Sequence, residues 1–161
     1  MKPLIYPFAA TLIFIASCGS PSPQTETPKQ EPLQNNETTT PEGNPDYDPK
    51  RGEGKFTSVD LGSGLDKVMA DAGENIANVK CASCHKVSGE KLVGPGWKGV
   101  TERRTPVWIM NFITNPDPMI DKDPAVQAQL EICLVRMPNQ GLNDDEARKI
   151  LEFMRKNDGV K

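Results

Sequence analysis

The stretch Cys81-Ala82-Ser83-Cys84-His85 decides how the rest of the chain is organised. Two cysteines three positions apart, followed directly by a histidine, form a C-x-x-C-H motif, which indicates covalent attachment of a c-type haem. Each thiol can form a thioether with a vinyl group of the porphyrin, and the histidine is then held against the iron. Since the chain has only 1 histidine, His85 is the one imidazole available as proximal ligand.

Two other uses of paired cysteines fit less well. A zinc site needs about four ligands, and the further candidates are the adjacent His85, which would struggle to reach the same ion, and the distant Cys133. A thioredoxin-like redox pair is expected near a βαβ pattern, and no such pattern surrounds residue 81. The motif therefore predicts haem, with zinc and dithiol chemistry as the weaker alternatives.

The N-terminus has the pattern of an export signal. Lys2 precedes an apolar run over residues 4–16, which suits a signal peptide and is shorter than the about 20 apolar residues of a spanning helix. The run ends in Ile15-Ala16-Ser17-Cys18-Gly19, which resembles a bacterial lipobox, so we expect cleavage after residue 17 and lipidation of Cys18, with palmitate among its acyl chains. Ordinary secretion and a retained membrane anchor are the alternatives.

Composition divides the remaining chain in two. Residues 18–59 are rich in Pro, Thr, Glu, Gln, Asn and Gly and have almost no apolar periodicity, which predicts a disordered tether behind the lipidated cysteine. Residues 60–161 show short helical patterns separated by Gly and Pro, and no convincing strand. Only 36% of the chain is hydrophobic, so a buried porphyrin would supply apolar mass that the core lacks. The formal net charge of −3 is too small to indicate nucleic-acid binding.

Apolar periodicity predicts helices at about 64–80, 106–115, 124–136 and from 144 onward. The expected inward residues of the first helix are Leu65, Val68, Met69, Ala72, Ile76 and Val79. The second begins with Pro106 after the cap Thr105, and its expected apolar face is Trp108, Ile109, Phe112 and Ile113. The last begins at Asn143 with Glu146 three residues later, which is typical of a capping box. The Gly- and Pro-rich stretch 92–100 is expected to be a loop over the haem.

The second axial ligand decides between a carrier and a catalyst. A thioether in that position raises the reduction potential and occupies the site where oxygen or peroxide would react. Three methionines lie at packing positions on expected helices: Met69, Met110 and Met154. Met137 lies at a helix break, and Pro138 keeps its backbone extended, so it is the expected ligand. Met119, in an expected loop, is the competitor. Cys133 is expected to be a small core residue.

With these features in order, residues 64–161 resemble a class I, mono-haem cytochrome c. The resemblance implies an all-α fold of about four helices around one covalent haem c. It implies the following site residues: Cys81 and Cys84 as thioethers, His85 and Met137 as axial ligands, and Pro95 as the residue whose carbonyl orients the His85 ring.

The resemblance also implies that the first and last helices cross at a glycine–aromatic contact, here Gly73 and Phe153. The chain departs from the family at Ala77, where an aromatic residue is common. This departure concerns local packing and leaves the haem assignment untouched.

The expected function is single-electron transfer by a membrane-tethered carrier, with no enzyme activity and no small-molecule substrate. We expect a lipid anchor in the bacterial cell envelope, the haem domain on the non-cytoplasmic, periplasmic side, and redox protein partners that are membrane-associated. A terminal oxidase or a nitrogen-oxide reductase is suggested by family analogy. Residues 80–104 hold more basic than acidic residues, which would steer an acidic partner or form an ordinary solvated face. The alternative function is a haem enzyme or gas sensor with an open or displaceable axial position.

Overall fold

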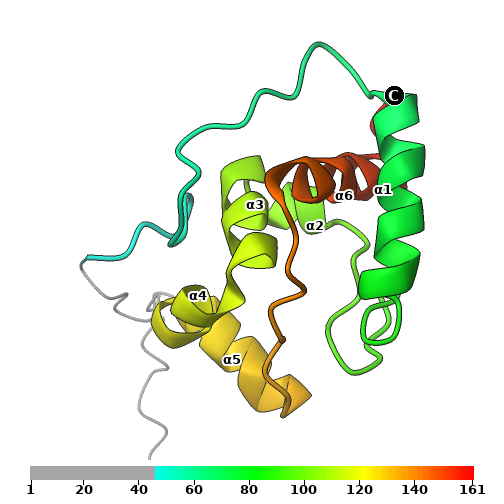
Figure 1. Ribbon diagram of the computed structural model, residues 1–161. Coiled ribbons are helices and arrows are strands. Elements are labelled where there is room, and N and C mark those ends of the chain that lie inside the picture. Colours follow the sequence, from blue (N-terminus) through cyan, green and yellow to red (C-terminus); the bar gives the residue numbers. More distant parts are fainter. Residues whose placement is uncertain (1–45) are drawn as a thin grey trace, which may run out of the picture. The chain divides into compact units, whose positions relative to one another are not determined.

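A computed structural model of the chain describes residues 46–161. The expected signal peptide, the lipidated Cys18 and the expected tether up to residue 45 lie outside the described residues. Within 46–161 the chain forms six helices and no strand (Figure 1), which confirms the all-α expectation. The helices are α1 (Lys67–Lys80), α2 (Val100–Arg103), α3 (Pro106–Thr114), α4 (Pro116–Lys122), α5 (Pro124–Cys133) and α6 (Asp144–Asn157). Over the same residues, none of them is long and apolar enough to cross a membrane.

The short helix α2 was not expected from the sequence. It follows Gly99, whose φ of 72° is in the left-handed region that glycine adopts readily. The Asp158 carboxylate accepts hydrogen bonds from the N–H of Gly99 at 2.6 Å and of Thr101 at 2.9 Å. Since Asp158 lies near the C-terminal end of the chain, no local sequence pattern predicts this helix.

The second unexpected helix, α4, replaces the loop predicted around Met119. Asn115 ends α3 and also precedes Pro116, the first residue of α4, a position where proline is tolerated because its missing N–H would have no helical partner. Met119 is fully buried on this helix. The next helix, α5, ends at Cys133 rather than near residue 136, because Leu134 adopts a left-handed φ of 60°.

Helices α1 and α6 pack against each other more extensively than any other pair. The buried residues of α1 are the small ones, Ala70, Gly73 and Ala77. The expected inward residues Val68 and Val79 are instead 82% and 83% exposed, so that part of the prediction was wrong. Small side chains occupy the face of α1 that packs on α6, because they let the backbones of the two helices approach closely.

Gly73 lies at the crossing of α1 and α6. A Cβ atom there would lie 1.9 Å from the carbonyl oxygen of Lys149, so glycine is required by the closeness of the two backbones. The three atoms nearest to such a Cβ are backbone atoms of Lys149 and Ile150, and the expected contact with Phe153 stays a prediction. The ring of Phe153 packs edge-on against Trp97, at 6.3 Å between centroids.

Helix α6 begins with the predicted capping box between Asn143 and Glu146. Farther along, the fully buried Glu152 accepts hydrogen bonds from Arg148, Arg155 and the N–H of Asp66, which is the cap of α1. Burial raises the pKa of Glu152, but these hydrogen bonds outweigh it and hold the pKa below its ordinary value. The carboxylate thereby ties the start of α1 to α6.

Residues 46–59, which we call the strap, were expected to belong to the tether but pack against the helices. The Tyr47 hydroxyl donates to the Asp123 carboxylate at 2.6 Å, and the indole N–H of Trp108 donates to the same carboxylate at 2.8 Å. The Asn111 side-chain amide accepts a hydrogen bond from the N–H of Phe56 and donates one to its carbonyl. Figure 1 shows the strap running from beside α4 and past α3, and residues 60–66 then continue to the start of α1. The packed region therefore begins earlier than residue 60, because α3 offers the strap buried polar partners.

Candidate functional site

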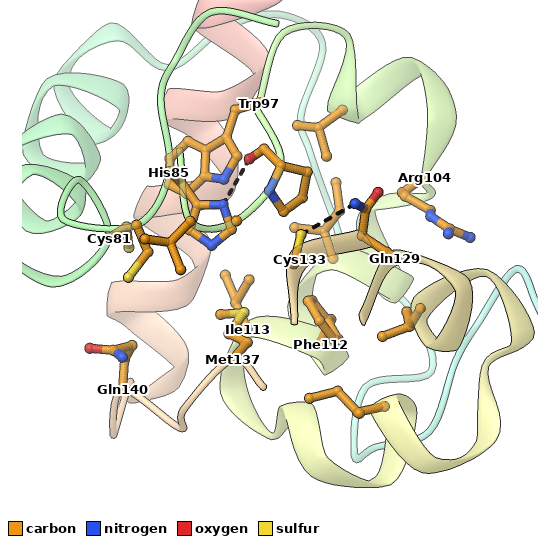
Figure 2. Close-up of a pocket in the computed structure, with 18 of the residues that line it drawn as sticks. Cys81, His85, Trp97, Arg104, Phe112, Ile113, Gln129, Cys133, Met137 and Gln140 are labelled. Atoms are coloured by element: carbon orange, nitrogen blue, oxygen red, sulfur yellow. Dashed lines mark hydrogen bonds between the residues drawn. The ribbon is translucent and has the colours of Figure 1, made fainter. Parts of the chain in front are cut away.

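An apolar cavity lies beside the C-terminal end of α1 (Figure 2). Its walls are the motif, the loop 93–97, α3, α5, the segment 135–142 and α6. The apolar face predicted for α3 is confirmed, because its residues all line this cavity: Trp108, Ile109, Phe112 and Ile113. Cys81, Cys84, His85, Pro95 and Met137 line it too, so the structure brings together every site residue predicted within 46–161.

A tight turn at the end of α1 presents the two motif cysteines. The carbonyl of Cys81 accepts hydrogen bonds from the N–H of Cys84 at 3.0 Å and of His85 at 2.9 Å. Both cysteines are free thiols, and burial raises the pKa of Cys81 to about 11. Among residues 46–161 there is no cluster of three or more His, Cys, Asp or Glu side chains that could hold a metal ion. The structure thus adds no support for the zinc alternative.

The loop after the motif holds the His85 ring. Nδ1 of His85 lies 2.9 Å from the Pro95 carbonyl oxygen, so Nδ1 carries the proton and Nε2 keeps its lone pair for a metal. Burial lowers the pKa of His85 below its ordinary value, against the opposing effect of this hydrogen bond. The N–H of Gly94 donates to the Cys84 carbonyl at 2.8 Å, and a Cβ at Gly94 would lie 2.4 Å from the imidazole.

Of the two candidate thioether ligands, only Met137 lines the cavity. Figure 2 shows the His85 ring and the Met137 side chain on facing sides of it. Met119 packs instead beneath Gly52 of the strap, where a Cβ would lie 2.4 Å from its Cε atom. Met154, whose expected role is helix packing, also lines the cavity from α6.

The charged residues that line the cavity are all basic: Lys80, Arg103, Arg104 and Arg136. Arg104 lies over the Trp108 ring, 4.2 Å from its centroid, and Lys80 lies 3.2 Å from the Glu146 carboxylate. The basic excess over residues 80–104 indicated three of them, whereas Arg136 comes from a distant segment and was not indicated. A cavity lined by cations suits a bound group that carries carboxylates.

Cys133 was expected in the core but is half-buried on the cavity wall. The Gln129 amide donates to its sulfur at 3.3 Å, one turn earlier on α5 (Figure 2). Its thiol therefore has a polar neighbour that the pattern did not indicate.

These residues fit a covalent haem. Two free thiols lie at one end of an apolar cavity, an oriented imidazole has an available lone pair, and a thioether faces it. Gly94 leaves room for the ring where a side chain would displace it. Two thiols could attach the porphyrin, and an imidazole nitrogen and a thioether sulfur are groups that could bind its iron.

Comparison with known proteins gives the following matches. The cytochrome c family model matches residues 70–158. A solved structure of cytochrome c from Rhodothermus marinus is 35% identical, with 65% of this chain and 90% of that chain covered and a TM-score of 0.63. An engineered form of it is 34% identical at the same coverage, with a TM-score of 0.62. Another engineered form, bound to a carbene intermediate, is 34% identical with a TM-score of 0.59. No curated protein matches the chain.

Proposed function

Since the chain belongs to the cytochrome c family, we propose that it is a lipid-anchored electron carrier whose haem iron is bound by His85 and Met137. Membership makes it a haem-binding electron-transfer protein with one covalently attached haem c. The proposal adds the attachment residues Cys81 and Cys84, the axial ligands, the anchor at Cys18 and the partners.

The observation that carries the proposal is the meeting of both motif thiols, His85 and Met137 in one apolar cavity. When bound, the haem supplies one-electron chemistry between ferrous and ferric iron. Pro95 orients the imidazole through its carbonyl, which fixes the tautomer and raises the basicity of the ring. The aromatic and aliphatic walls would keep water away from the bound group, and Met137 would supply the ligand that excludes a small molecule from its iron.

The partners we propose are redox proteins at a membrane. Cys18 would anchor the chain in the bacterial cell envelope with the haem domain on the non-cytoplasmic side, the periplasm, where a terminal oxidase or nitrogen-oxide reductase is a suitable acceptor. Near the haem motif, Lys80 and Lys86 pair with Glu146 and Glu90, which weakens the predicted basic surface. Among residues 80–104, three exposed cations have no salt bridge to a carboxylate and support steering of an acidic protein: Lys91, Lys98 and Arg103.

The alternative is a haem enzyme or gas sensor whose axial ligand is displaceable. One observation favours it, since an engineered cytochrome c that is 34% identical is bound to a carbene intermediate. The two functions differ in whether the iron is accessible in the natural sequence.

Carbon monoxide binding tests the proposal. The ferrous holoprotein should bind carbon monoxide slowly and weakly, and Met137→Ala should bind it rapidly and lower the reduction potential. The matched control is Met119→Ala, which should lower stability by about 2–5 kcal/mol by leaving a core cavity while its spectrum stays unchanged. Rapid binding by the natural protein would favour the enzyme or sensor, and an unchanged Met137→Ala spectrum would rule out Met137 as ligand.

A further inference from the structure

The segment 135–142, which carries Met137, has little backbone support. It lies between Leu134, which ends α5 with a left-handed φ of 60°, and α6. Within the described part of the chain, no backbone–backbone hydrogen bond reaches any of its residues. The position of Met137 therefore depends on the contacts that the side chains of this segment make with the rest of the protein.

Arg136, the residue before Met137, makes the strongest of these attachments. Its guanidinium Nη1 and Nη2 both lie 3.1 Å from the Asp121 carboxylate, and Nη2 also lies 3.0 Å from that of Asp117. These two aspartates are one helical turn apart on α4, so a single planar guanidinium reaches both. One further contact is weaker, from the Asn139 amide to the Thr114 carbonyl at 3.3 Å.

Helix α4 is a firm support for this bridge. Met119 and Ile120 bury its inner face, and Asp123 at its end accepts hydrogen bonds from Tyr47 and Trp108. A segment held to α4 is therefore held to the same framework that walls the cavity. Arg136 itself also lines the cavity beside Met137.

We propose that Arg136 is a positioning residue, which holds the Met137 thioether in the cavity by bridging Asp117 and Asp121 of α4. This inference rests on the proposed function, in which Met137 is an axial ligand. Loss of the bridge would free the backbone next to Met137, so the thioether would be held less firmly in the position where it could bind the iron. The side chains are about half exposed, and exposed ion pairs are modest in strength, so about a fivefold change is expected.

A general loss of stability is the competing explanation, and the chain offers a matched control. Lys156 of α6 also bridges two carboxylates, Asp71 at 2.7 Å and Glu74 at 3.0 Å on α1, with similar exposure. This bridge joins two helices away from the cavity lining. Its removal should change stability as much as removal of the Arg136 bridge, without acting on Met137.

The experiment uses the full holoprotein and two optical readouts. One is the rate of carbon monoxide binding to the ferrous form, and the other is the weak absorption of a ferric iron–thioether bond. Arg136→Gln and the double variant Asp117→Asn with Asp121→Asn should each bind carbon monoxide about fivefold faster than the natural protein and lose part of the thioether absorption. Arg136→Lys should give an intermediate rate, and Lys156→Gln should leave both readouts unchanged.

Two results would overturn the positioning role alone: a slow natural protein with an equally slow Arg136→Gln variant, or a Lys156→Gln variant that accelerates as much as Arg136→Gln. A natural protein that binds carbon monoxide rapidly and lacks the thioether absorption would overturn the axial assignment of Met137, and the positioning role with it. The failure of the inference is thus distinguishable from failure of the proposed function.

Discussion

Nδ1 of His85 lies 2.9 Å from the carbonyl oxygen of Pro95, ten residues farther along the chain. This hydrogen bond settles which nitrogen of the ring stays available for a metal. It forms because the intervening loop returns to the motif, where the Cys84 carbonyl accepts hydrogen bonds from the N–H groups of Val93 and Gly94. A change that displaces the loop should therefore also displace the His85 ring.

Gly94→Ala should damage the site. The added methyl group would lie 2.4 Å from Cε1 of His85, so either the ring or the loop must move and the bond to Pro95 is lost. We expect a lower ratio of haem to protein and a changed visible spectrum. Gly89→Ala is the control, since a Cβ there has nothing within 4 Å. Equal behaviour of the two variants would contradict the close packing of the loop on the ring.

Gly73→Ala should destabilise the fold. Alanine is better than glycine in a helix by about 1 kcal/mol, but its methyl group would lie 1.9 Å from the Lys149 carbonyl oxygen. Separating two helix backbones is costly, so we expect a net loss of about 2 kcal/mol in the free energy of unfolding. Denaturant unfolding measures it, with Asn75→Ala on the exposed side of α1 as the control. A stabilised Gly73→Ala variant would show that α1 and α6 are not in close contact.

Tyr47→Phe should weaken the attachment of the strap. The buried hydroxyl that donates to Asp123 would be lost, and the free energy of unfolding at neutral pH should fall by about 1–2 kcal/mol. Chemical denaturation of the two proteins side by side measures this difference.

The same pair of proteins should differ in alkaline stability. Burial, together with the hydrogen bond and charge of Asp123, raises the pKa of Tyr47 above its ordinary value of 10.0. The folded state therefore binds this proton more tightly than the unfolded state, so the stabilisation is fully present below pH 10 and falls as the pH rises above it. The stability difference between natural protein and Tyr47→Phe should shrink above pH 10. Parallel stability curves would refute the burial of the hydroxyl.

Cys18→Ser should release the protein from membranes. If Cys18 carries the lipid, the serine variant lacks its anchor, and fractionation of cells should move the haem protein from the membrane to the soluble fraction. A variant that retains the export signal but stays with the membrane would exclude lipidation at this position as the anchor.

Local patterns predicted much of the fold because they depend on neighbours in sequence. The caps Thr105, Asp123 and Asn143 each accept hydrogen bonds from backbone N–H groups two or three residues later, so they are visible in a short window. The faces were harder to predict. Periodicity placed Val68 on the inward face, and only the approach of α6 decides that Ala70, on nearly the opposite side of the helix, is buried while Val68 is exposed.

The strap and the Arg136 bridge could not be predicted for the same reason. Tyr47 and Asp123 are 76 residues apart, and Arg136 and Asp117 are 19 residues apart. No window of sequence contains both members of such a pair. The strap has the composition of a tether. It packs against the helices because Asn111 and Trp108 of α3 form hydrogen bonds with it.

By itself, the sequence determined the cofactor, the order of the main helices and the candidates for the axial ligands, because C-x-x-C-H, the helix caps and the Met-Pro break are local chemistry. The tertiary structure alone decided that Met137 and not Met119 lines the cavity opposite His85, and that Arg136, the residue before Met137, bridges two aspartates of α4. The physical reason is that the ability of a side chain to bind a metal depends on its own chemistry, which the sequence gives. Whether that side chain reaches the cavity depends on close packing between segments that are distant in sequence.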